Sequence, residues 1–176
     1  MGAAKSTTRK AVTYNSAGHV ESCVFCNIVA GSDPQATSII GRTPKVSAFH
    51  PRTPSASNHI LVVPNEHIQN ISTIKPGPTS SALLREMKQF GLQCVQEEEP
   101  SIQEKDCRFV FHRPPFNSVD HLHLHVHVEP YVTKWKKLTY APGWPWCESY
   151  DSLYSKINIT GEISGGGESR NNQSKL

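Results

Sequence analysis

FNSVDHLHLHVHVEP, residues 116–130, is the segment that decides the fold. Four histidines alternate in it with leucine or valine: His121, His123, His125 and His127. Because successive side chains of a strand point to opposite faces, this two-residue period predicts a strand with the imidazoles on one face. An ordinary solvent-exposed face of a strand does not require histidine, because Thr, Lys or Gln would serve there equally well. Imidazole is close to neutral at working pH, so the row indicates a nucleophile, a proton donor or a set of metal ligands.

The composition describes a chain of one domain with tails, because 176 residues are too few for two domains of ordinary size. Its 18 Lys and Arg residues against 15 Asp and Glu residues give a net charge of +3, too little to indicate a dedicated nucleic-acid surface. Five cysteines without an apolar leader favour a reducing compartment. We therefore expect a cytoplasmic protein that can also be nuclear, and no run is long enough to span a bilayer.

The two ends of the chain differ in composition from its middle. Residues 1–20 lack apolar periodicity and predict a flexible arm, residues 21–158 form the expected domain, and the glycine-rich residues 159–176 predict a disordered tail. Gly2 after Met1, followed by Ser6, fits the pattern for N-terminal myristoylation. One such chain would give weak membrane association.

The pattern of the middle part predicts an α+β fold. Residues 23–30 fit a short helix closed by Gly31, and residues 79–97 fit the one long amphipathic helix, begun after Pro78 and capped by Thr79 or Ser80. Residues 45–50, 59–64 and 107–112 read as strands, residues 65–72 as a helical turn and residues 149–157 as a last short helical stretch. Without βαβ alternation, we expect an antiparallel sheet of about five strands with one long and one short helix.

Cys23 and Cys26 form a second constellation, with two residues between them. This spacing brings two thiolates to one metal ion when further ligands come from elsewhere in the chain. The alternative is a pair of ordinary buried cysteines. The spacing alone leaves both interpretations open.

Four blocks together resemble the histidine triad family, whose signature alternates three histidines with apolar residues. They are CVFC at 23–26, AFH at 48–50, HILVVPNEHI at 59–68 and NSVDHLHLHV at 117–126, and they occur in family order across about residues 23–131. The chain looks most like the Hint-type branch, and FHRPPFNS at 111–118 resembles the group called histidine triad nucleotide-binding protein 3. The resemblance implies the fold of this family.

The resemblance also sets the register of the triad. A family serine lies three residues before the first triad histidine, and Ser118 holds that place relative to His121. The triad is then His121, His123 and His125, and His127 takes a position that is apolar in the family, where we expect a surface or hydrogen-bonded side chain.

The activity implied by the resemblance is that of an adenosine 5′-monophosphoramidase, which cleaves purine nucleoside 5′-phosphoramidates. The position of His123 is that of the family nucleophile, which attacks the α-phosphate and forms a nucleotidyl-histidine that water then cleaves. His125 and His59 match residues that contact the phosphate, and Ser118 matches a hydroxyl implicated in protonating the leaving group.

Nucleotide binding is expected from the following residues: Phe25, Ile28, Phe49, His50, Asn117, Ser118, His123 and His125. Two positions depart from the family. Pro51 replaces an aspartate that holds the ribose hydroxyls, so ribose recognition must differ. Phe116 replaces a glycine near the phosphate, and its bulk narrows the pocket.

Zinc is the cofactor that the resemblance implies, with no organic cofactor. His67 and His121 match the residues that complete the Cys23 and Cys26 site in zinc-containing relatives, and four such ligands make a closed structural site. Family members commonly pair, so a homodimer is expected beside the small-molecule nucleotide, an AMP derivative.

Three rival interpretations stay open. A nucleotide-binding adaptor with little turnover would fit the missing ribose aspartate. A metal-dependent hydrolase would use the histidine row as ligands, but only Asp120 and Glu129 offer nearby carboxylates, and strand alternation turns them away. Removal of AMP from nucleic-acid ends, as in aprataxin, is disfavoured by the modest charge and by the lack of a zinc-finger spacing after the triad.

Overall fold

A computed structural model describes residues 7–165 of the chain, with side chains up to Asn158. The myristoylation pattern at Gly2 lies outside the described residues, as does the tail from residue 166. Among residues 7–165, no helix combines the length and the apolar character needed to cross a membrane.

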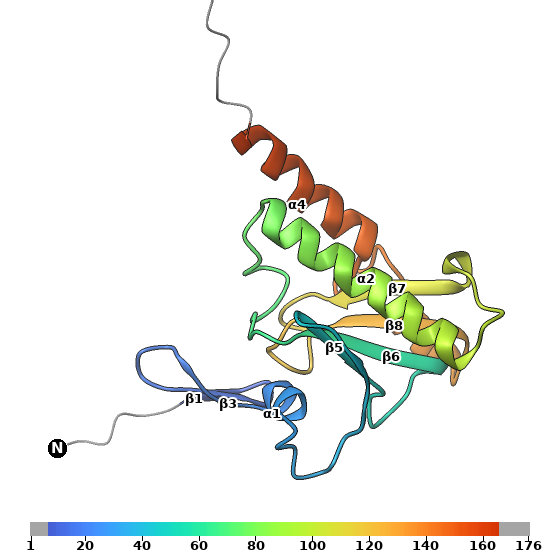
Figure 1. Cartoon of the computed structure of the whole chain (residues 1–176), viewed down its shortest axis with the longest axis horizontal. Coiled ribbons are helices and arrows are strands. Elements are labelled where there is room, and N and C mark those ends of the chain that lie inside the picture. The colour runs from blue at the N-terminus through green and yellow to red at the C-terminus, as the bar shows by residue number, and fades with distance from the viewer. Residues whose placement is uncertain (1–6, 166–176) are drawn as a thin grey trace, which may run out of the picture.

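A six-stranded antiparallel sheet forms the centre of the molecule, and the α+β class is confirmed (Figure 1). In spatial order its strands are β4 (Ile39–Arg42), β5 (Val46–Phe49), β6 (Ala56–Pro64), β8 (Leu124–Tyr131), β7 (Cys107–His112) and β9 (Cys147–Ser149). The histidine-bearing strand β8 is therefore central, between β6 and β7. Strands β7 and β8, which residues 113–123 connect, pair in antiparallel direction as expected.

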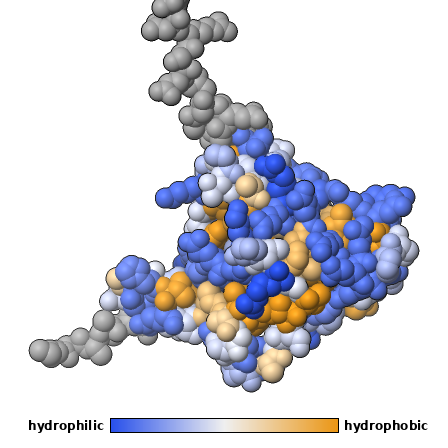
Figure 2. All heavy atoms as spheres, in the orientation of Figure 1, coloured by the Kyte–Doolittle hydropathy of each residue, from blue (hydrophilic) through white to orange (hydrophobic). Residues whose placement is uncertain are grey.

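Helices α2 (Pro78–Glu98) and α4 (Tyr150–Gly165) lie together over one face of this sheet (Figure 1). Leu84, Met87 and Val95 of α2 recur at helical spacing and are buried in the main core. At Gly91 a Cβ atom would lie 2.8 Å from Cγ2 of Val126, so glycine allows the helix to approach the sheet closely. Figure 2 shows that the outer side of α2 is mostly hydrophilic. The helices cover the apolar face of β8 and leave its histidine face to the site.

A small antiparallel meander precedes the sheet and leads into α1 (Val24–Ala30). Its strands are β1 (Thr7–Arg9), β2 (Val12–Tyr14) and β3 (Val20–Cys23). Helix α1 ends at Gly31 as predicted, in the left-handed conformation at φ 72°. The expectation of a flexible arm over residues 1–20 is wrong from Thr7 onward. These strands are short and mostly exposed, so no apolar period marks them, although Val12 is fully buried.

The structure corrects three further expectations. The disordered tail expected over residues 159–176 is wrong for 159–165, because α4 continues to Gly165 once its packed first turns have formed. Helix α2 begins after Gly77 with Pro78 in its first turn and without the side-chain cap expected from Thr79 or Ser80. Residues 65–72 form bends and a turn, not a helix. The remaining helices are η1 (Glu104–Asp106) and α3 (Lys134–Thr139).

Candidate active site

The histidine row lies on one face of the sheet, as the alternation predicts. The ring centroids of His123 and His125 are 4.9 Å apart, and those of His125 and His127 are 5.7 Å apart with nearly parallel planes. The regular strand begins only at Leu124, so His123 precedes the ladder while its ring stays beside that of His125. Neighbouring strands hold the row in place, because His125 pairs with Leu61 of β6 and with Val110 of β7.

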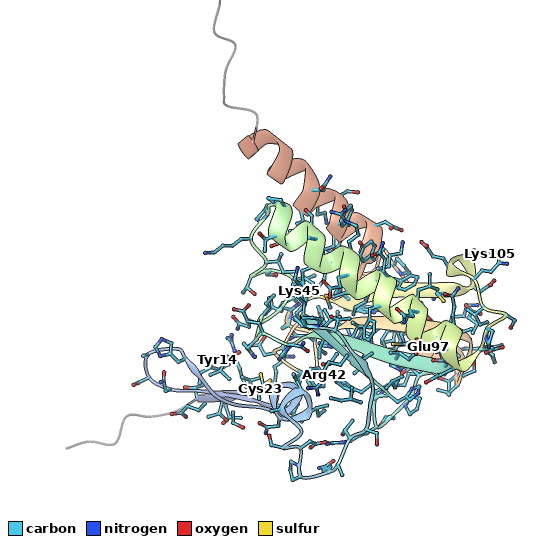
Figure 3. The ribbon with its side chains drawn as sticks, in the orientation of Figure 1. Tyr14, Cys23, Arg42, Lys45, Glu97 and Lys105 are labelled. Atoms are coloured by element: carbon cyan, nitrogen blue, oxygen red, sulfur yellow. The ribbon has the colours of Figure 1, made fainter. Side chains whose placement is uncertain are left out.

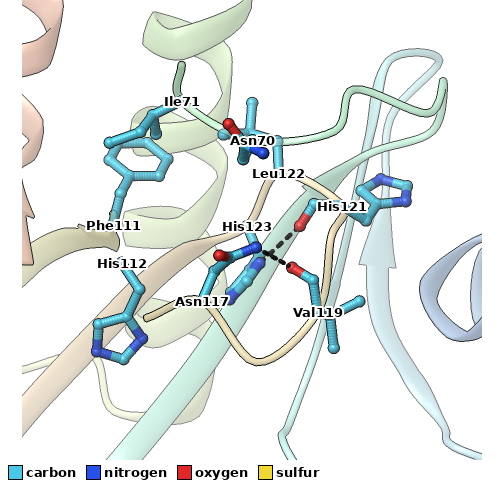
Figure 4. A pocket seen from close by; sticks show the side chains of 9 residues that line it. All are labelled: Asn70, Ile71, Phe111, His112, Asn117, Val119, His121, Leu122 and His123. Carbon is cyan, nitrogen blue, oxygen red and sulfur yellow. Dashed lines mark hydrogen bonds between the residues drawn. The ribbon is translucent and has the colours of Figure 1, made fainter. Parts of the chain in front are cut away.

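His123 presents one free ring nitrogen. Its Nδ1–H donates to the backbone oxygen of His121 at 2.6 Å, as Figure 4 shows. Its Nε2 is buried and has no hydrogen-bond partner among the described residues. Burial lowers the pKa of His123 to about 4, so the ring is neutral near pH 7. With the proton held on Nδ1, the lone pair of Nε2 is available to attack an electrophile.

His125 presents an N–H group where His123 presents a lone pair, and a chain of hydrogen bonds fixes this tautomer. The backbone N–H of Ser55 donates to Nδ1 of His59 at 3.1 Å, which places the proton of neutral His59 on Nε2. That Nε2 lies 3.0 Å from Nδ1 of His125 and donates to it. Burial lowers the pKa of His59 to about 3 and that of His125 well below its usual value. Neutral His125 therefore carries its proton on Nε2, which has no partner among the described residues and can donate to a bound anion.

A cavity of about 280 Å³ lies beside the triad and unites most of the residues expected to bind the nucleoside. Phe25, Ile28, Phe49, His50 and Ser118 all line it. The ring of His50 is already engaged, with Nδ1 3.0 Å from the oxygen of His59 and Nε2 2.8 Å from Glu98, so it serves as a wall.

Asn117, which is also expected to bind the nucleotide, does not line this cavity. Its side chain is buried and donates to the backbone oxygen of Val119 at 3.0 Å, a bond drawn in Figure 4. It borders a space of about 10 Å³ beside His123, about the size of one water molecule. Asn117 therefore shapes the loop before the triad.

A second cavity, of about 350 Å³, lies on the other side of the triad and is lined by aromatic rings. Its walls are His112, Phe116, Trp135, Thr139 and Trp146. Phe116 is 54% exposed and Trp135 is 70% exposed, which is unusual for side chains of this size. Trp144 stacks on Trp146 at 4.9 Å. The cavity reaches the triad through His112, whose ring centroid is 4.8 Å from that of His125.

His112 and Tyr140 belong to the site although sequence reasoning missed them. Val110 pairs with His125, and continuing this antiparallel register by two residues places His112 opposite His123. That register was the available signal for His112. Tyr140 follows α3, and its ring lies 5.0 Å from His125 and 4.3 Å from His127. Nothing in the local sequence marks Tyr140, because its approach depends on tertiary packing.

His127 is neither a surface nor a hydrogen-bonded residue, contrary to expectation. Its ring is 1% exposed and lies 4.0 Å from the ring of His59. Both ring nitrogens lack hydrogen-bond partners among the described residues. Burial, followed by the charges of the surrounding side chains, lowers its pKa to about 2, so the ring remains neutral. A buried polar group without a partner costs stability.

We expect His127→Leu to stabilise the protein by about 1–2 kcal/mol, because leucine removes two unpaired buried nitrogens from a packed site. Urea unfolding measures this as a higher midpoint at unchanged slope. His127→Asn is the matched control, since it keeps a polar group there and should not raise the midpoint. A lower midpoint for His127→Leu would contradict the argument.

Cys23, Cys26, His67 and His121 form a cluster of four potential metal ligands beside the triad. One donor atom from each lies within 4.8 Å of all the others. Nδ1 of His121 is 3.4 Å from Sγ of Cys23 and 3.5 Å from Sγ of Cys26, and Nδ1 of His67 is 3.4 Å from Sγ of Cys26. In tetrahedral zinc sites, bonds of about 2.0–2.3 Å give ligand separations of roughly 3.5 Å.

Protonation in this cluster also suits a metal. Nε2 of His121 donates to the backbone oxygen of Pro64 at 3.0 Å, which leaves the lone pair of Nδ1 facing the two sulfurs. The hydrogen bond from the Cys26 thiol lowers the pKa of the Cys23 thiol despite its burial. Thiolate is the form that binds metals. His121 thus faces the sulfurs, while its backbone oxygen orients His123.

Two further groups of histidines come close enough to share an ion: His59, His125 and His127, and His112, His123 and His125. Neither group includes a carboxylate from the described part of the chain. The carboxylate of Asp120 accepts from Arg9 and Tyr14, and exposed Glu129 pairs with Lys137, so both are turned away from the row. Hydrolysis by a metal-bound water would lack a carboxylate base here.

Comparison with known proteins places most of the chain among relatives of known type. A family model described as "Scavenger mRNA decapping enzyme C-term binding" matches residues 22–140. A protein of Arabidopsis thaliana named bifunctional adenosine 5′-phosphosulfate phosphorylase/adenylylsulfatase HINT4 is 41% identical over 124 residues, which are 70% of this chain and 82% of the relative. An adenosine 5′-monophosphoramidase HINT3 of Danio rerio is 32% identical over 126 residues, 70% of this chain and 76% of the relative.

Solved structures show the same fold. A HIT family hydrolase from Clostridium thermocellum is 28% identical, has a TM-score of 0.54 and covers 64% of this chain and 94% of its own. A HIT family hydrolase from Legionella pneumophila has the same identity and TM-score, and covers 64% of this chain and 96% of its own.

Proposed function

This chain belongs to the histidine triad family of nucleotide hydrolases, and on that premise we propose that it is a phosphoramidase for purine nucleoside 5′-phosphoramidates, with adenosine as the nucleoside. The observation that carries the proposal is the pairing of tautomers, because His123 offers a lone pair where the adjacent His125 offers an N–H. A nucleophile beside a fixed donor suits displacement at a phosphoryl centre.

The proposed reaction has two displacements at phosphorus. Nε2 of His123 forms a bond to the α-phosphorus while the bond from phosphorus to the amine nitrogen breaks, and the departing amine takes a proton, for which Ser118 is the proposed donor. Nε2–H of His125 donates to a phosphoryl oxygen as charge develops on it. Water then attacks phosphorus and gives a proton back to Ser118 as the bond to His123 breaks, so that AMP, free His123 and protonated Ser118 remain.

The two cavities support a division between nucleoside and leaving group. The cavity lined by Phe25, Ile28 and Phe49 offers apolar walls for a purine. The aromatic cavity lined by Phe116, Trp135 and Trp146 lies across the triad and is the proposed place of the leaving amine, with a planar ring as its best fit.

Adenylyl sulfate is the second candidate substrate, because the relative of 41% identity is named for adenosine 5′-phosphosulfate. It would share the attack by His123 and differ only in its leaving group. A sulfate needs cationic or donor groups and gains nothing from an aromatic cavity. This difference makes the leaving group the feature to vary.

A substrate panel tests the proposal. Wild-type protein should hydrolyse the indolylethylamine adenosine phosphoramidate with a higher kcat/KM than the unsubstituted phosphoramidate or adenylyl sulfate. Trp135→Ala should lower kcat/KM about tenfold for the indolyl substrate only, since one aromatic contact is worth about 1.4 kcal/mol. Val132→Ala, exposed and outside the cavity, is the matched control.

The panel also separates the alternatives. Faster turnover of adenylyl sulfate than of every phosphoramidate would replace the proposed function by the second candidate. Binding of AMP without turnover of any substrate would favour the nucleotide-binding adaptor.

The cluster of Cys23, Cys26, His67 and His121 fits zinc, which we propose as a structural ion, with no organic cofactor. Four protein ligands would leave no open coordination position on the ion, so its role would be to hold separate segments of the chain together. These residues would join the start of α1 to the segment after β6 and to the first triad residue. A homodimer, cytoplasmic or nuclear location and weak membrane association through Gly2 stay predictions.

A further inference from the structure

The turn between β1 and β2 has an unusual backbone. Arg9 pairs with Val12, so Lys10 and Ala11 form a two-residue turn, with φ of 48° and 55° respectively. Such a turn matches the twist of a hairpin, but it normally carries Asn-Gly, because residues with a larger side chain rarely adopt positive φ. Strained turns of this kind persist where their surroundings hold them, and they concentrate at functional sites.

The surroundings of this turn are parts of the candidate active site. The backbone oxygen of Lys10 accepts the N–H of Asp120 at 3.0 Å, and Nζ of Lys10 donates to the oxygen of Pro115. The oxygen of Ala11 accepts the N–H of Val24, the first residue of α1, at 3.3 Å. Ala11 also lines the nucleoside cavity together with Phe25. Hydrogen bonds therefore hold the turn between α1 and the loop that precedes the triad.

Asp120 connects this hairpin to the triad. Its side chain is buried, and five side-chain donors converge on its two oxygens: Arg9 at 3.0 Å, Tyr14 at 2.9 Å, Gln69 at 2.7 Å, Asn70 at 3.0 Å and Asn117 at 3.4 Å. Two of these donors, Arg9 and Tyr14, come from the hairpin, and Figure 3 shows Tyr14 on the meander that leads to Cys23. Both oxygens of a carboxylate accept hydrogen bonds, whereas an amide would place a donating NH2 group against some of these donors.

Asp120 lies in the chain between two residues of the proposed mechanism. Asp120 follows Ser118 by two residues and directly precedes His121, whose backbone oxygen orients His123. The buried carboxylate and the donors that converge on it thus anchor the backbone between the expected proton donor and the nucleophile.

We infer that the β1–β2 hairpin is a working part of the nucleotide site: Ala11 is a specificity-determining wall of the nucleoside cavity, and the hairpin acts through Asp120 as a positioning element for Ser118 and His123. The inference rests on the proposed function in taking this cavity as the place of the nucleoside.

Substitution of Ala11 tests the wall. Asn tolerates positive φ, so Ala11→Asn keeps the turn and adds atoms to the cavity. We expect its Kd for AMP to rise about tenfold, with a melting temperature close to that of the wild type. Ala11→Gly also keeps the turn but adds no atoms, and its Kd should change less than threefold. Thr8→Ala is the control on the same hairpin, since Thr8 is exposed and bonds Thr13.

Substitution of the hairpin donors tests the positioning. Tyr14→Phe removes one bond to Asp120 and Asp120→Asn disturbs all of them, so kcat should fall about threefold and at least tenfold respectively. Kd for AMP should stay within threefold of the wild type in both, because the cavity wall is intact. A purely structural role would instead lower the folded fraction and leave kcat per folded molecule unchanged. Tyr14→Phe keeps the test decisive if Asp120→Asn does not fold.

The outcomes separate this inference from the proposed function. An unchanged Kd for AMP in Ala11→Asn, or unchanged kcat per folded molecule in Tyr14→Phe, would overturn the corresponding part of the inference even if phosphoramidates are hydrolysed. Conversely, wild-type protein that binds AMP but hydrolyses no phosphoramidate would end the proposed function, while the AMP affinities would still decide the role of Ala11.

Discussion

His123→Ala should lower kcat for an adenosine phosphoramidate by roughly 10⁴-fold or more, because removal of a covalent nucleophile leaves only the binding and electrostatic contributions. Nε2 of His123 has no partner among the described residues, so the hydrogen bond lost with the ring is the one from Nδ1–H to the backbone oxygen of His121. AMP affinity should stay within a few-fold of the wild type, since the nucleoside cavity is lined by other residues.

A single-turnover experiment with substrate labelled on the α-phosphate measures this directly. Wild-type protein quenched early should carry label on His123, and His123→Ala should carry none. His125→Ala is the matched variant, because it keeps the nucleophile and removes a donor to the phosphoryl oxygen. We expect it to form the labelled intermediate about 10²-fold more slowly. Turnover by His123→Ala within tenfold of the wild type would contradict the covalent mechanism.

A chelator separates the covalent mechanism from a metal-bound nucleophile. Hydrolysis through His123 should continue for short times in excess chelator, because neither the attacking atom nor the donor on His125 depends on an ion. A hydrolase that uses His59, His125 and His127, or His112, His123 and His125, as metal ligands would stop at once. Neither group includes a carboxylate from the described part of the chain, which agrees with continued hydrolysis in chelator.

The parts of the site that local sequence predicts are those with a regular period. The alternation of residues 121–127 predicts one face of rings, and the rings of His123, His125 and His127 do lie beside one another. The strand predicted over residues 107–112 is β7 to the residue, because its apolar run ends at a proline-rich loop. Gly31 ends α1 as expected, since a left-handed residue terminates the helix.

The parts that sequence reasoning misses depend on polar contacts between distant segments. The β1–β2 hairpin has no apolar period, and its attachment to Asp120 spans 111 residues between Arg9 and the carboxylate. Tyr140 reaches the histidine rings from beyond α3. The hydrogen bond of the buried Asn117 amide to the backbone oxygen of Val119 is likewise marked by no sequence pattern. The periodicity of a sequence does not predict which donor will form a hydrogen bond with a given buried acceptor.

The cluster of Cys23, Cys26, His67 and His121 lies between these two cases. The spacing of Cys23 and Cys26 left a metal site and an ordinary buried pair both open, and the family resemblance supplied the two histidines. The structure brings all four donor atoms together from three separate segments. His121 also connects this cluster to the proposed nucleophile. Its Nε2 donates to the backbone oxygen of Pro64, and its backbone oxygen accepts from Nδ1 of His123. A crosslink at this point would stiffen the start of the triad.

Cys23→Ser should remove bound zinc and lower the free energy of unfolding by on the order of 5 kcal/mol. Structural zinc binds zinc-finger peptides with about 10–16 kcal/mol, and only part of this is lost here because the sheet has a core of its own. Protein prepared without added metal should contain about one zinc ion per chain by elemental analysis, with four protein ligands as in closed structural sites. The variant should contain almost none.

Cys107→Ser is the matched control for this loss, because Cys107 is a free, half-buried cysteine outside the cluster. Its zinc content should equal that of the wild type. Since His121 joins the cluster to the nucleophile, Cys23→Ser should also lower kcat more than it raises the Kd for AMP, whereas a remote loss of stability would change neither per folded molecule. Wild-type protein without zinc, or Cys23→Ser that retains it, would show that the two cysteines are an ordinary buried pair.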